Sequence, residues 1–300
     1  MTVRIGTRGS ALALTQSGHV AELLGTDYEL VEIRTSGDEG GRRPPETQDK
    51  SRFVKEIEEA LLAGEIDLAV HSAKDVPGRL PDGLAIVGVP AREDARDALV
   101  GAASLDDLPG GAVVGTSSLR RRAQLLAARP DLHVEELRGN VDTRLRKLAG
   151  GGYDAVVLAL AGLRRLGRDG GAAPLDAGLL TPAPGQGCLA LEGRRDDPRV
   201  AELAAAVTDT EALVRLTAER ALVERLEATC HTPVGAYAEL GDDGLLLAAF
   251  VGTPDGGTWI RDAAVGAAAE PARLGAEVGE RLLAAGAAEV LAAAEIAAPR

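Results

Sequence analysis

The sequence predicts an α/β protein with two α/β domains followed by a small C-terminal α+β domain. Up to about residue 207, short apolar strands alternate with helical patterns, which is typical of α/β domains. Beyond Pro233 the pattern changes to alternating strands with Gly-Asp turns and one Ala-rich helix. The length of 300 residues also exceeds the size at which a single core keeps growing, so two or three domains are expected.

The first domain is predicted to comprise residues 1–95 and a returning segment, residues 188–207. A strand at residues 3–5 leads through Gly6-Thr7-Arg8-Gly9-Ser10 into a helical pattern over residues 11–24, for which Ser10 is a natural N-cap. Residues 39–48 have no apolar period, so we expect a mobile loop there. The remaining elements are strands at residues 28–34, 66–70 and 84–89 and a helix over residues 53–63.

The second domain is predicted to comprise residues 96–187. After a charged connector at residues 92–97, the alternation of strands and helices restarts, with strands at 112–114, 133–137 and 154–160. A stiff, glycine-punctuated crossing at residues 181–187 precedes a strand at 188–191. We expect that strand to return the chain to the first domain.

The third domain is predicted to comprise residues 208–300. Two helical stretches, at residues 198–207 and 210–227, lead into it. They are followed by strands at residues 236–240, 245–251 and 258–265 and by a helix over residues 272–285.

The bulk composition excludes several classes of protein. A net charge of −13 argues against general nucleic-acid binding, which requires a basic face. No stretch approaches the roughly 20 uninterrupted apolar residues of a membrane span, and the N-terminus lacks a charged-then-apolar leader. We therefore expect a cytoplasmic protein that binds neither nucleic acid nor membranes.

The segment around Asp75 is the first catalytic candidate. An apolar strand at residues 66–70 ends in His71-Ser72-Ala73-Lys74-Asp75-Val76-Pro77, and ligands of α/β sheets collect outside the carboxyl ends of strands. A carboxylate beside an ammonium group is held ionised or is poised to exchange a proton. The alternative is a strand-end turn with a solvated pair of Lys74 and Asp75.

Arginine residues lie at several junctions between strands and helices. In the second domain, three successive strand ends are followed by Arg120 and Arg121, by Arg138 and Arg144, and by Arg165. A guanidinium group binds carboxylate or phosphate through two parallel hydrogen bonds, and a helix N-terminus adds backbone N–H groups. The pattern predicts a ligand with several carboxylates. A phosphate ligand would fit the same geometry, but no Walker A or GxGxxG pattern is present.

The two cysteines, Cys188 and Cys230, are too far apart in sequence to form a disulfide framework or a CxxC metal site. Cys230 lies beside His231 in a loop before Pro233, where a thiol can act as a nucleophile or an attachment point. The alternative for Cys230 is a small buried hydrophobic residue. A metal site is not expected, because further ligands at suitable spacing are missing.

Seven segments resemble, in order, the motifs of the hydroxymethylbilane synthases, a family also called the porphobilinogen deaminases. The match runs from residue 3 to about residue 240, and seven ordered motifs make it highly specific. The segments are Gly6 to Ser10, Lys50 to Glu56, His71 to Pro77, Gly115 to Arg121, Arg138 to Arg144, Gly185-Gln186-Gly187, and Cys230 to Gly235.

The resemblance implies two hinged domains like those of periplasmic binding proteins, with the site in their cleft, and a small third domain. It also implies a dipyrromethane cofactor, made from two porphobilinogen units and attached to Cys230 by a thioether. Four further porphobilinogen molecules would be condensed head to tail with loss of ammonia. Hydrolysis would then release hydroxymethylbilane.

The same resemblance implies a role for each matching residue. Asp75 is implied as the catalytic carboxylate. The residues implied to bind the cofactor are Cys230, Lys74, Thr116, Ser117, Arg120, Arg121 and Arg144. The residues implied to bind substrate are Arg8, Ser10, Arg138, Arg165, Gln186, Lys50 and Phe53.

A hinged two-domain sensor or organic-anion-binding protein without catalysis is the alternative hypothesis. It would use the same arginines but would have no turnover to lose when Asp75 is replaced. In the leading hypothesis the partner is a small molecule, porphobilinogen, and the protein is a monomer.

Overall fold

The computed structural model describes residues 2–36, 54–228 and 232–297. The chain divides into two compact units, one formed by Met1–Glu93 with Cys188–Leu216 and the other by Asp94–Gly187 with Thr217–Arg300. The finer division into three domains, with a boundary at residue 207, stays a prediction. The expected mobile loop at residues 39–48 lies outside the described residues.

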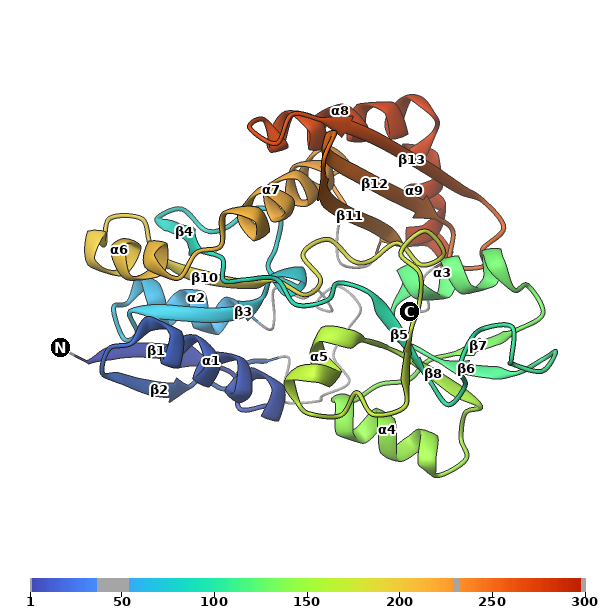
Figure 1. Ribbon diagram of the computed structural model, residues 1–300, viewed down its shortest axis with the longest axis horizontal. Helices are drawn as coiled ribbons and strands as arrows, with labels where there is room; N and C mark the ends of the chain where they lie inside the picture. The colour runs from blue at the N-terminus through green and yellow to red at the C-terminus, as the bar shows by residue number, and fades with distance from the viewer. Residues whose placement is uncertain (1, 37–53, 229–231, 298–300) are drawn as a thin grey trace. The chain divides into compact units, whose positions relative to one another are not determined.

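The first unit is built on a five-stranded mixed sheet with the strand order β2-β1-β3-β10-β4 (Figure 1). The strands β1 (Val3–Thr7), β2 (Tyr28–Glu32) and β3 (Leu68–Ser72) are parallel. Strand β10 (Leu189–Arg194) runs antiparallel between β3 and β4 (Leu84–Gly88). The crossing segment therefore returns the chain to this sheet, as the sequence predicts.

Helices cover both faces of the first sheet. Helices α1 (Ala11–Leu24) and α6 (Pro198–Ala206) pack on one face, where Leu68 and Val70 lie in the core. Helix α2 (Lys55–Leu62) packs on the other face, against Ala69. Successive residues of a strand point to opposite faces, so a strand covered on both sides reads as the continuous apolar run seen before His71.

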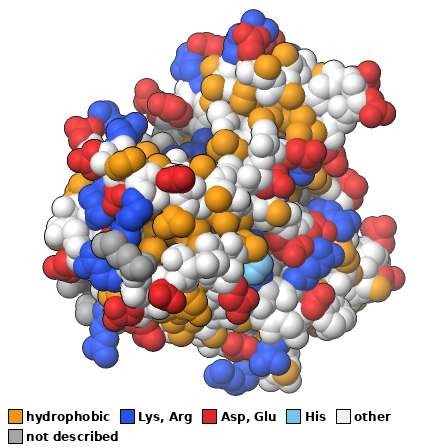
Figure 2. All heavy atoms as spheres, turned by 60° about the vertical axis from the view of Figure 1, so that its left-hand side comes forward, with side chains coloured by type: hydrophobic (Ala, Val, Ile, Leu, Met, Phe, Trp, Pro, Cys, Tyr) orange, Lys and Arg blue, Asp and Glu red, His pale blue; other side chains and the backbone are white. Residues whose placement is uncertain are grey.

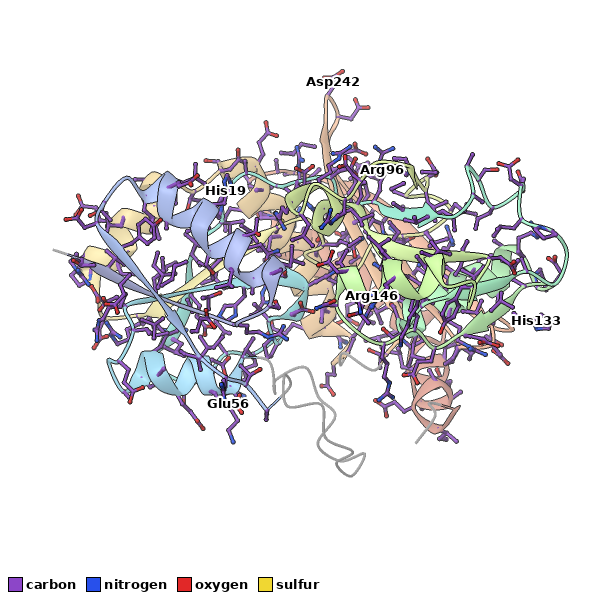
Figure 3. The ribbon with its side chains drawn as sticks, turned by 90° about the horizontal axis from the view of Figure 1, so that it is seen from below. His19, Glu56, Arg96, His133, Arg146 and Asp242 are labelled. Atoms are coloured by element: carbon purple, nitrogen blue, oxygen red, sulfur yellow. The ribbon has the colours of Figure 1, made fainter. Side chains whose placement is uncertain are left out.

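Two local contacts fix the helices of the first unit. Ser10 caps α1, because its Oγ accepts a hydrogen bond from the backbone N–H of Ala13 at 3.3 Å, which confirms the predicted N-cap. Glu56 on α2 (Figure 3) accepts a hydrogen bond from the backbone N–H of Ser36 at 2.9 Å. The second contact ties the segment after β2 to α2.

The second unit contains a sheet with the order β7-β6-β8-β5-β9. The parallel strands are β6 (Val113–Gly115), β7 (His133–Glu135) and β8 (Ala155–Ala159), and β5 (Asp97–Val100) runs antiparallel to β8 and to β9 (Ala172–Pro174). The helices are α3 (Leu119–Ala128), α4 (Val141–Ala149) and α5 (Leu160–Arg165). Each of these five-stranded sheets thus combines four strands that run in one direction with one antiparallel strand, which begins just after the chain crosses into the unit.

A separate antiparallel sheet, β11-β12-β13, follows helix α7 (Thr210–Arg225). Its strands are β11 (Val234–Gly241), β12 (Gly244–Gly252) and β13 (Trp259–Gly266). Helices α8 (Pro271–Ala284) and α9 (Ala287–Ala297) pack on this sheet. The predicted fold class, two α/β sheets plus a small α+β part, is confirmed.

Sequence reasoning missed the short helix α5 and three further elements, β5, β9 and α9. The charged connector predicted at residues 92–97 ends in β5, whose four residues are too short to show a period. Strand β9 has only three residues and ends in a proline, and α9 is so rich in alanine that its polar and apolar faces are hard to distinguish. Tertiary contacts rather than local pattern define all three.

Charged side chains of both signs are mixed over the face of the molecule shown in Figure 2. The net charge of −13 is therefore not gathered into a patch of one sign on that face. Within the part of the chain that the structure describes, no helix has the length and apolar character needed to cross a membrane.

Candidate functional site

The carboxyl ends of the parallel strands in the first sheet carry the candidate catalytic residue. Strand β3 ends at Ser72 and continues into a 3-10 turn, Ala73–Asp75. A pocket of about 80 Å³ at this edge is lined by Asp75 together with Arg8 and Ser10, which follow β1. Three residues predicted from two separate motifs thus meet at one pocket, which is lined by both a carboxylate and a guanidinium.

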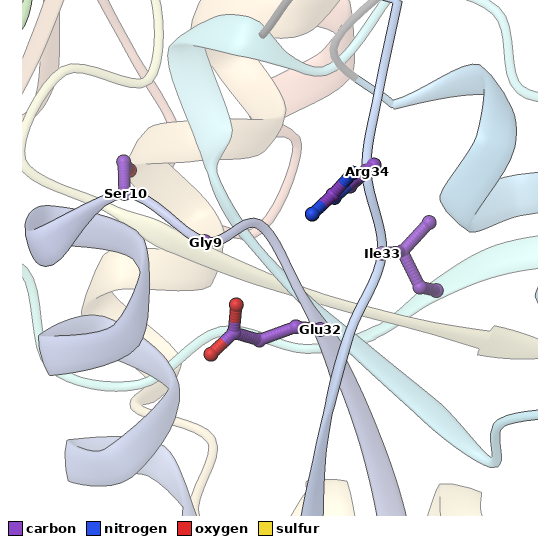
Figure 4. A pocket seen from close by; sticks show the side chains of 5 residues that line it. All are labelled: Gly9, Ser10, Glu32, Ile33 and Arg34. Carbon is purple, nitrogen blue, oxygen red and sulfur yellow. The ribbon is translucent and has the colours of Figure 1, made fainter.

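A second opening of about 310 Å³ lies beside the segment that follows β1 (Figure 4). It is lined by Gly9 and Ser10 on one side and by Glu32, Ile33 and Arg34 at the end of β2 on the other. A Cβ atom on Gly9 would lie 3.0 Å from Oε2 of Glu32, so the backbone at residue 9 approaches that carboxylate closely. Sequence reasoning gave Glu32 and Arg34 no role, although both follow the end of a strand.

Gln16 supports the turn that carries Asp75. Its Nε2 lies 3.0 Å from Oγ of Ser72, and that hydroxyl in turn lies 3.2 Å from Oε1 of Gln16. Gln16 is buried on α1, so the pair locks the helix to the end of β3. A glutamine nearly two turns after the N-cap, within a mostly apolar helix face, is the signal that sequence reasoning overlooked.

A group of buried titratable side chains lies behind this edge of the sheet. Nε2 of His71 on β3 lies 3.0 Å from Oε2 of Glu192 on β10, and the two side chains are 4% and 0% exposed. Glu58 on α2 is also buried. Burial raises the pKa of Glu58, and the neighbouring charge of Glu192 raises it further, to about 7. Sequence reasoning missed this group, although Glu192 interrupts an apolar strand.

Glu58→Gln is expected to change how stability depends on pH. The pKa of Glu58 is about 7 in the folded protein and ordinarily 4.5, so the folded state binds the extra proton between these values. The free energy of unfolding of the wild-type protein should therefore fall as pH rises from 4.5 through 7, by at most about 3 kcal/mol, and this contribution should level off within about one pH unit above 7. Urea unfolding across this range measures it.

The glutamine variant has no proton to lose and should lack this fall. Glu59→Gln is the matched control, because Glu59 lies next along α2 and its side chain is 63% exposed. The control should keep the wild-type slope. Equal slopes for Glu58→Gln and the wild type would contradict the prediction.

In the second unit, Arg120 and Arg121 are buried around Asp97, the first residue of β5. Oδ1 of Asp97 accepts hydrogen bonds from Nε and Nη2 of Arg121 at 3.0 and 2.8 Å, and Oδ2 lies 2.8 Å from Nη2 of Arg120. Nε2 of Gln186 donates to the same Oδ1 at 2.8 Å. Asp97 thus brings together three residues that were predicted to bind ligands. The sequence had indicated only that Asp97 belongs to a charged connector.

The balance of charge in this Asp97 cluster is positive. Burial acts to raise the pKa of Asp97, but the charges of Arg120 and Arg121 outweigh it and lower that pKa to about 2. One carboxylate then faces two guanidinium groups, each at most 6% exposed. Nη1 of Arg120 donates to the carbonyl oxygen of Thr181 at 2.6 Å, while its buried Nε has no partner among the described residues. The cluster retains one positive charge and one unused donor.

A more open group around Arg144 lies where two helices begin. Nη2 of Arg144 donates to Oγ of Ser117 at 3.1 Å, next to the start of α3, and its Nε donates to the carbonyl oxygen of Gly139 at 2.8 Å, next to the start of α4. Gly139 has a φ of 121°, which favours glycine. Asn140 caps α4 by accepting from the N–H of Thr143 at 2.9 Å. These contacts hold a guanidinium beside the N–H groups of two helix ends.

The other predicted site residues make contacts of their own. The side chain of Arg138 is exposed and pairs with Glu136 at 2.6 Å. Nη2 of Arg165 donates to the carbonyl oxygen of Gly187 at 2.7 Å, and the hydroxyl of Thr116 accepts from the N–H of Ser118 at 3.2 Å. Lys74 is half-buried beside Asp75. Lys50, Phe53 and Cys230 lie outside the described residues.

Two further predictions concern Cys188 and metal binding. Cys188 is buried in the core of the first unit with Ala73 and Ala190, next to β10. In the described ranges, no three His, Cys, Asp or Glu side chains are placed to hold a metal ion.

The fold and the clustered arginines are those of an α/β protein with sites suited to anionic ligands, and comparisons with known proteins identify its family. The family model described as "Porphobilinogen deaminase, dipyromethane cofactor binding domain" matches residues 3–202 of this chain. The family model described as "Porphobilinogen deaminase, C-terminal domain" matches residues 213–284. The chain belongs to the porphobilinogen deaminase family. This confirms the resemblance predicted from the seven motifs.

Named relatives agree with the family models. The porphobilinogen deaminase of Thermus thermophilus is 49% identical over 299 residues, covering 97% of this chain and 98% of the relative. That of Brevibacillus brevis is 45% identical over 307 residues, covering 96% of each. Among solved structures, a periplasmic substrate-binding protein of an ABC transporter from Coxiella burnetii aligns with a TM-score of 0.42 and 16% identity, covering 70% of this chain and 94% of that one.

Proposed function

We propose that this protein is a hydroxymethylbilane synthase whose dipyrromethane cofactor is attached to Cys230 by a thioether, with Asp75 as the catalytic carboxylate. The family makes the chain a transferase of tetrapyrrole synthesis, with porphobilinogen as substrate. The observation that carries the assignment of residues is the meeting of Arg8, Ser10 and Asp75 at one pocket. These residues come from two motifs that are more than 60 positions apart in the sequence.

The proposed reaction joins four porphobilinogen molecules head to tail. At each step the aminomethyl carbon loses ammonia and bonds to a pyrrole carbon, which gives up a proton, and the ammonia and the proton leave together as ammonium. Hydrolysis finally releases hydroxymethylbilane. When bound, the dipyrromethane supplies the pyrrole carbon to which the first unit is added.

Asp75 would manage the charge that this reaction creates. Departure of ammonia leaves a positive charge on the methylene and pyrrole of the incoming unit, and a fixed carboxylate facing the pyrrole N–H stabilises that charge. The same carboxylate can relay the proton that leaves the ring carbon. The turn after β3 suits this role, because the Gln16–Ser72 pair holds it and Arg8 lines the same pocket as Asp75.

The arginines would hold the carboxylates of substrate and cofactor. Each porphobilinogen brings two carboxylates, so a chain of six rings carries twelve. Arg144 with Ser117 offers a guanidinium beside two helix N-termini, and the buried Asp97 cluster adds an uncompensated positive charge. These donors fit a polycarboxylate. The remaining proposed ligands are Lys50, Phe53, Lys74, Thr116, Arg121, Arg138, Arg165 and Gln186.

Attachment of the cofactor to Cys230 gives the most direct test. Intact-mass spectrometry of the purified protein should show added mass equal to a dipyrromethane, and Ehrlich's reagent should give a colour reaction. Cys230→Ser should lose both signals, because a hydroxyl is a much weaker nucleophile than a thiolate. Active protein with an unmodified Cys230 would refute the proposal.

Cys188→Ala is the matched control for this experiment. It removes the other thiol of the chain, which lies in the core of the first unit, and should keep the full adduct. Limiting porphobilinogen should also give a ladder of one to four added units on the wild-type protein. A cytoplasmic location, a monomeric state and the lack of a nucleic-acid partner remain predictions.

A further inference from the structure

The buried group formed by His71, Glu192 and Glu58 has no part in the reaction proposed above. His71 and Glu192 lie on neighbouring antiparallel strands, where His71 pairs in register with Ala190. Glu192 is two residues beyond Ala190, so it lies on the same face of the sheet as His71. Helix α2 covers this face and brings Glu58 to it.

Two carboxylates in this group lack the partners that a buried charge requires. Oε1 of Glu58 and Oε1 of Glu192 are buried without a hydrogen bond among the described residues. Burial and the charge of Glu192 raise the pKa of Glu58 to about 7, while the nearby His71 acts to lower it. The group therefore loses a proton close to neutral pH and then carries one more negative charge.

Other charged residues on the surrounding elements are engaged elsewhere or are solvent-exposed. Arg194 on β10 donates to the carbonyl oxygens of Leu61 and Ile66, and Arg4 on β1 pairs with Asp67 at 2.9 Å. Glu59 on α2 is exposed and acts weakly on Glu58. The charge of the group is thus set by its own three members.

His71 connects this group to the candidate site. It lines the same pocket of about 80 Å³ as Arg8 and Asp75, while its Nε2 faces Glu192. A charge added behind His71 acts on the pocket through the protein interior, where charges are screened less than in water.

We propose that Glu58, through Glu192 and His71, controls the charge behind the Arg8 pocket, so that ionisation of Glu58 weakens the binding of a carboxylated substrate there. Glu58 and His71 are positioning residues in this proposal, because neither needs to touch the reacting atoms. The proposal rests on the proposed function for the identity of the substrate. It predicts that the KM for porphobilinogen rises with pH around neutrality while kcat is little affected by this group.

The test compares the wild-type holoenzyme with Glu58→Gln and with Glu59→Gln, the exposed neighbour on the same helix. KM and kcat for porphobilinogen are measured from about pH 6 to about pH 8.5. The KM of the wild type and of Glu59→Gln should rise roughly 3- to 10-fold, as one added charge at moderate distance would cause, whereas the KM of Glu58→Gln should stay nearly constant. A rise that survives in Glu58→Gln would overturn the proposal.

A second measurement does not depend on turnover. Infrared difference spectra of the wild type against Glu58→Gln should show a protonated carboxyl band that disappears as pH rises through about 7. No such band would overturn the proposal even if the enzyme is active. If none of the three proteins turns over porphobilinogen at any pH, the proposed function fails and this inference fails with it, whereas turnover with an unchanged KM profile refutes this inference alone.

Discussion

Replacing Asp75 by glutamate is expected to lower the rate of ammonia release about 100-fold, because the carboxylate is displaced by roughly one methylene from the position at which it faces the substrate. The fold should be unaffected, since Asp75 is half-buried in a turn at the edge of the sheet. Single-turnover measurement of ammonia release, on protein already carrying its cofactor, separates this step from cofactor assembly.

Asp75→Ala extends the test to the alternative function. Loss of a group that both stabilises a developing charge and relays a proton should cost on the order of 10²–10⁴ in rate. A sensor protein would keep its ligand affinity in this variant and would have no turnover to lose. If Asp75→Ala released ammonia at the wild-type rate, Asp75 would have no catalytic role and would belong to a strand-end turn with a solvated pair of Lys74 and Asp75.

A matched control lies seven residues further along the chain. Asp82 is an exposed aspartate in the turn before β4, and Asp82→Glu should release ammonia at the wild-type rate. A comparable fall in both variants would show that the effect of Asp75→Glu comes from the added methylene in general and not from the position of Asp75.

Asp97→Asn is expected to lower the free energy of unfolding by about 3–5 kcal/mol, because it leaves two buried guanidinium groups facing no counter-charge. The side chain of Asp97 is 0% exposed and contacts Arg120, Arg121 and Gln186. The asparagine has nearly the same shape, so the loss would come from charge rather than from a cavity. Urea unfolding near pH 7 measures it.

The pH dependence of this difference has a definite sign. The pKa of Asp97 is lowered from 3.8 to about 2, so its stabilising contribution is fully present above pH 3.8 and is lost as pH falls through 2. The difference between wild type and Asp97→Asn should therefore be the same at about pH 7 and about pH 5. A difference that has already vanished at pH 5 would contradict the ion cluster.

Asp131→Asn is the control for Asp97→Asn. Asp131 also pairs with an arginine, since its Oδ2 lies 2.7 Å from Nη2 of Arg129, but its side chain is 43% exposed. Water screens such a pair, so the unfolding midpoint of Asp131→Asn should hardly move. Equal effects of the two substitutions would mean that burial of the Asp97 cluster contributes nothing.

Much of the fold could be predicted from the sequence because local rules suffice for it. Ser10 caps α1 because a hydroxyl before a helical pattern satisfies its free N–H groups, and the run before His71 reads as a strand buried on both faces. Strands β5 and β9 escaped prediction because segments of four and three residues carry too little pattern.

The candidate site was predicted in its residues but not in its contacts. Sequence spacing placed Arg120 and Arg121 at a helix start, where open binding of a ligand was expected. The structure buries both against Asp97, which lies 23 positions before Arg120 and looked like part of a solvated connector. Pairing of β5 with β8 and β9 is what carries Asp97 into the interior. Local sequence patterns contain no information on such a long-range contact.

The sequence by itself determined the family, the order of the strands and helices along most of the chain, and the motif that presents Asp75 after β3. These depend on residue types and on short-range periodicity, both of which can be identified in the sequence alone. Only the tertiary structure decided which charges are buried together: Asp97 with two arginines in one unit, and Glu58 with Glu192 and His71 in the other. The physical reason is that the cost of a buried charge depends on its neighbours in space, and those come from strands and helices far apart in sequence.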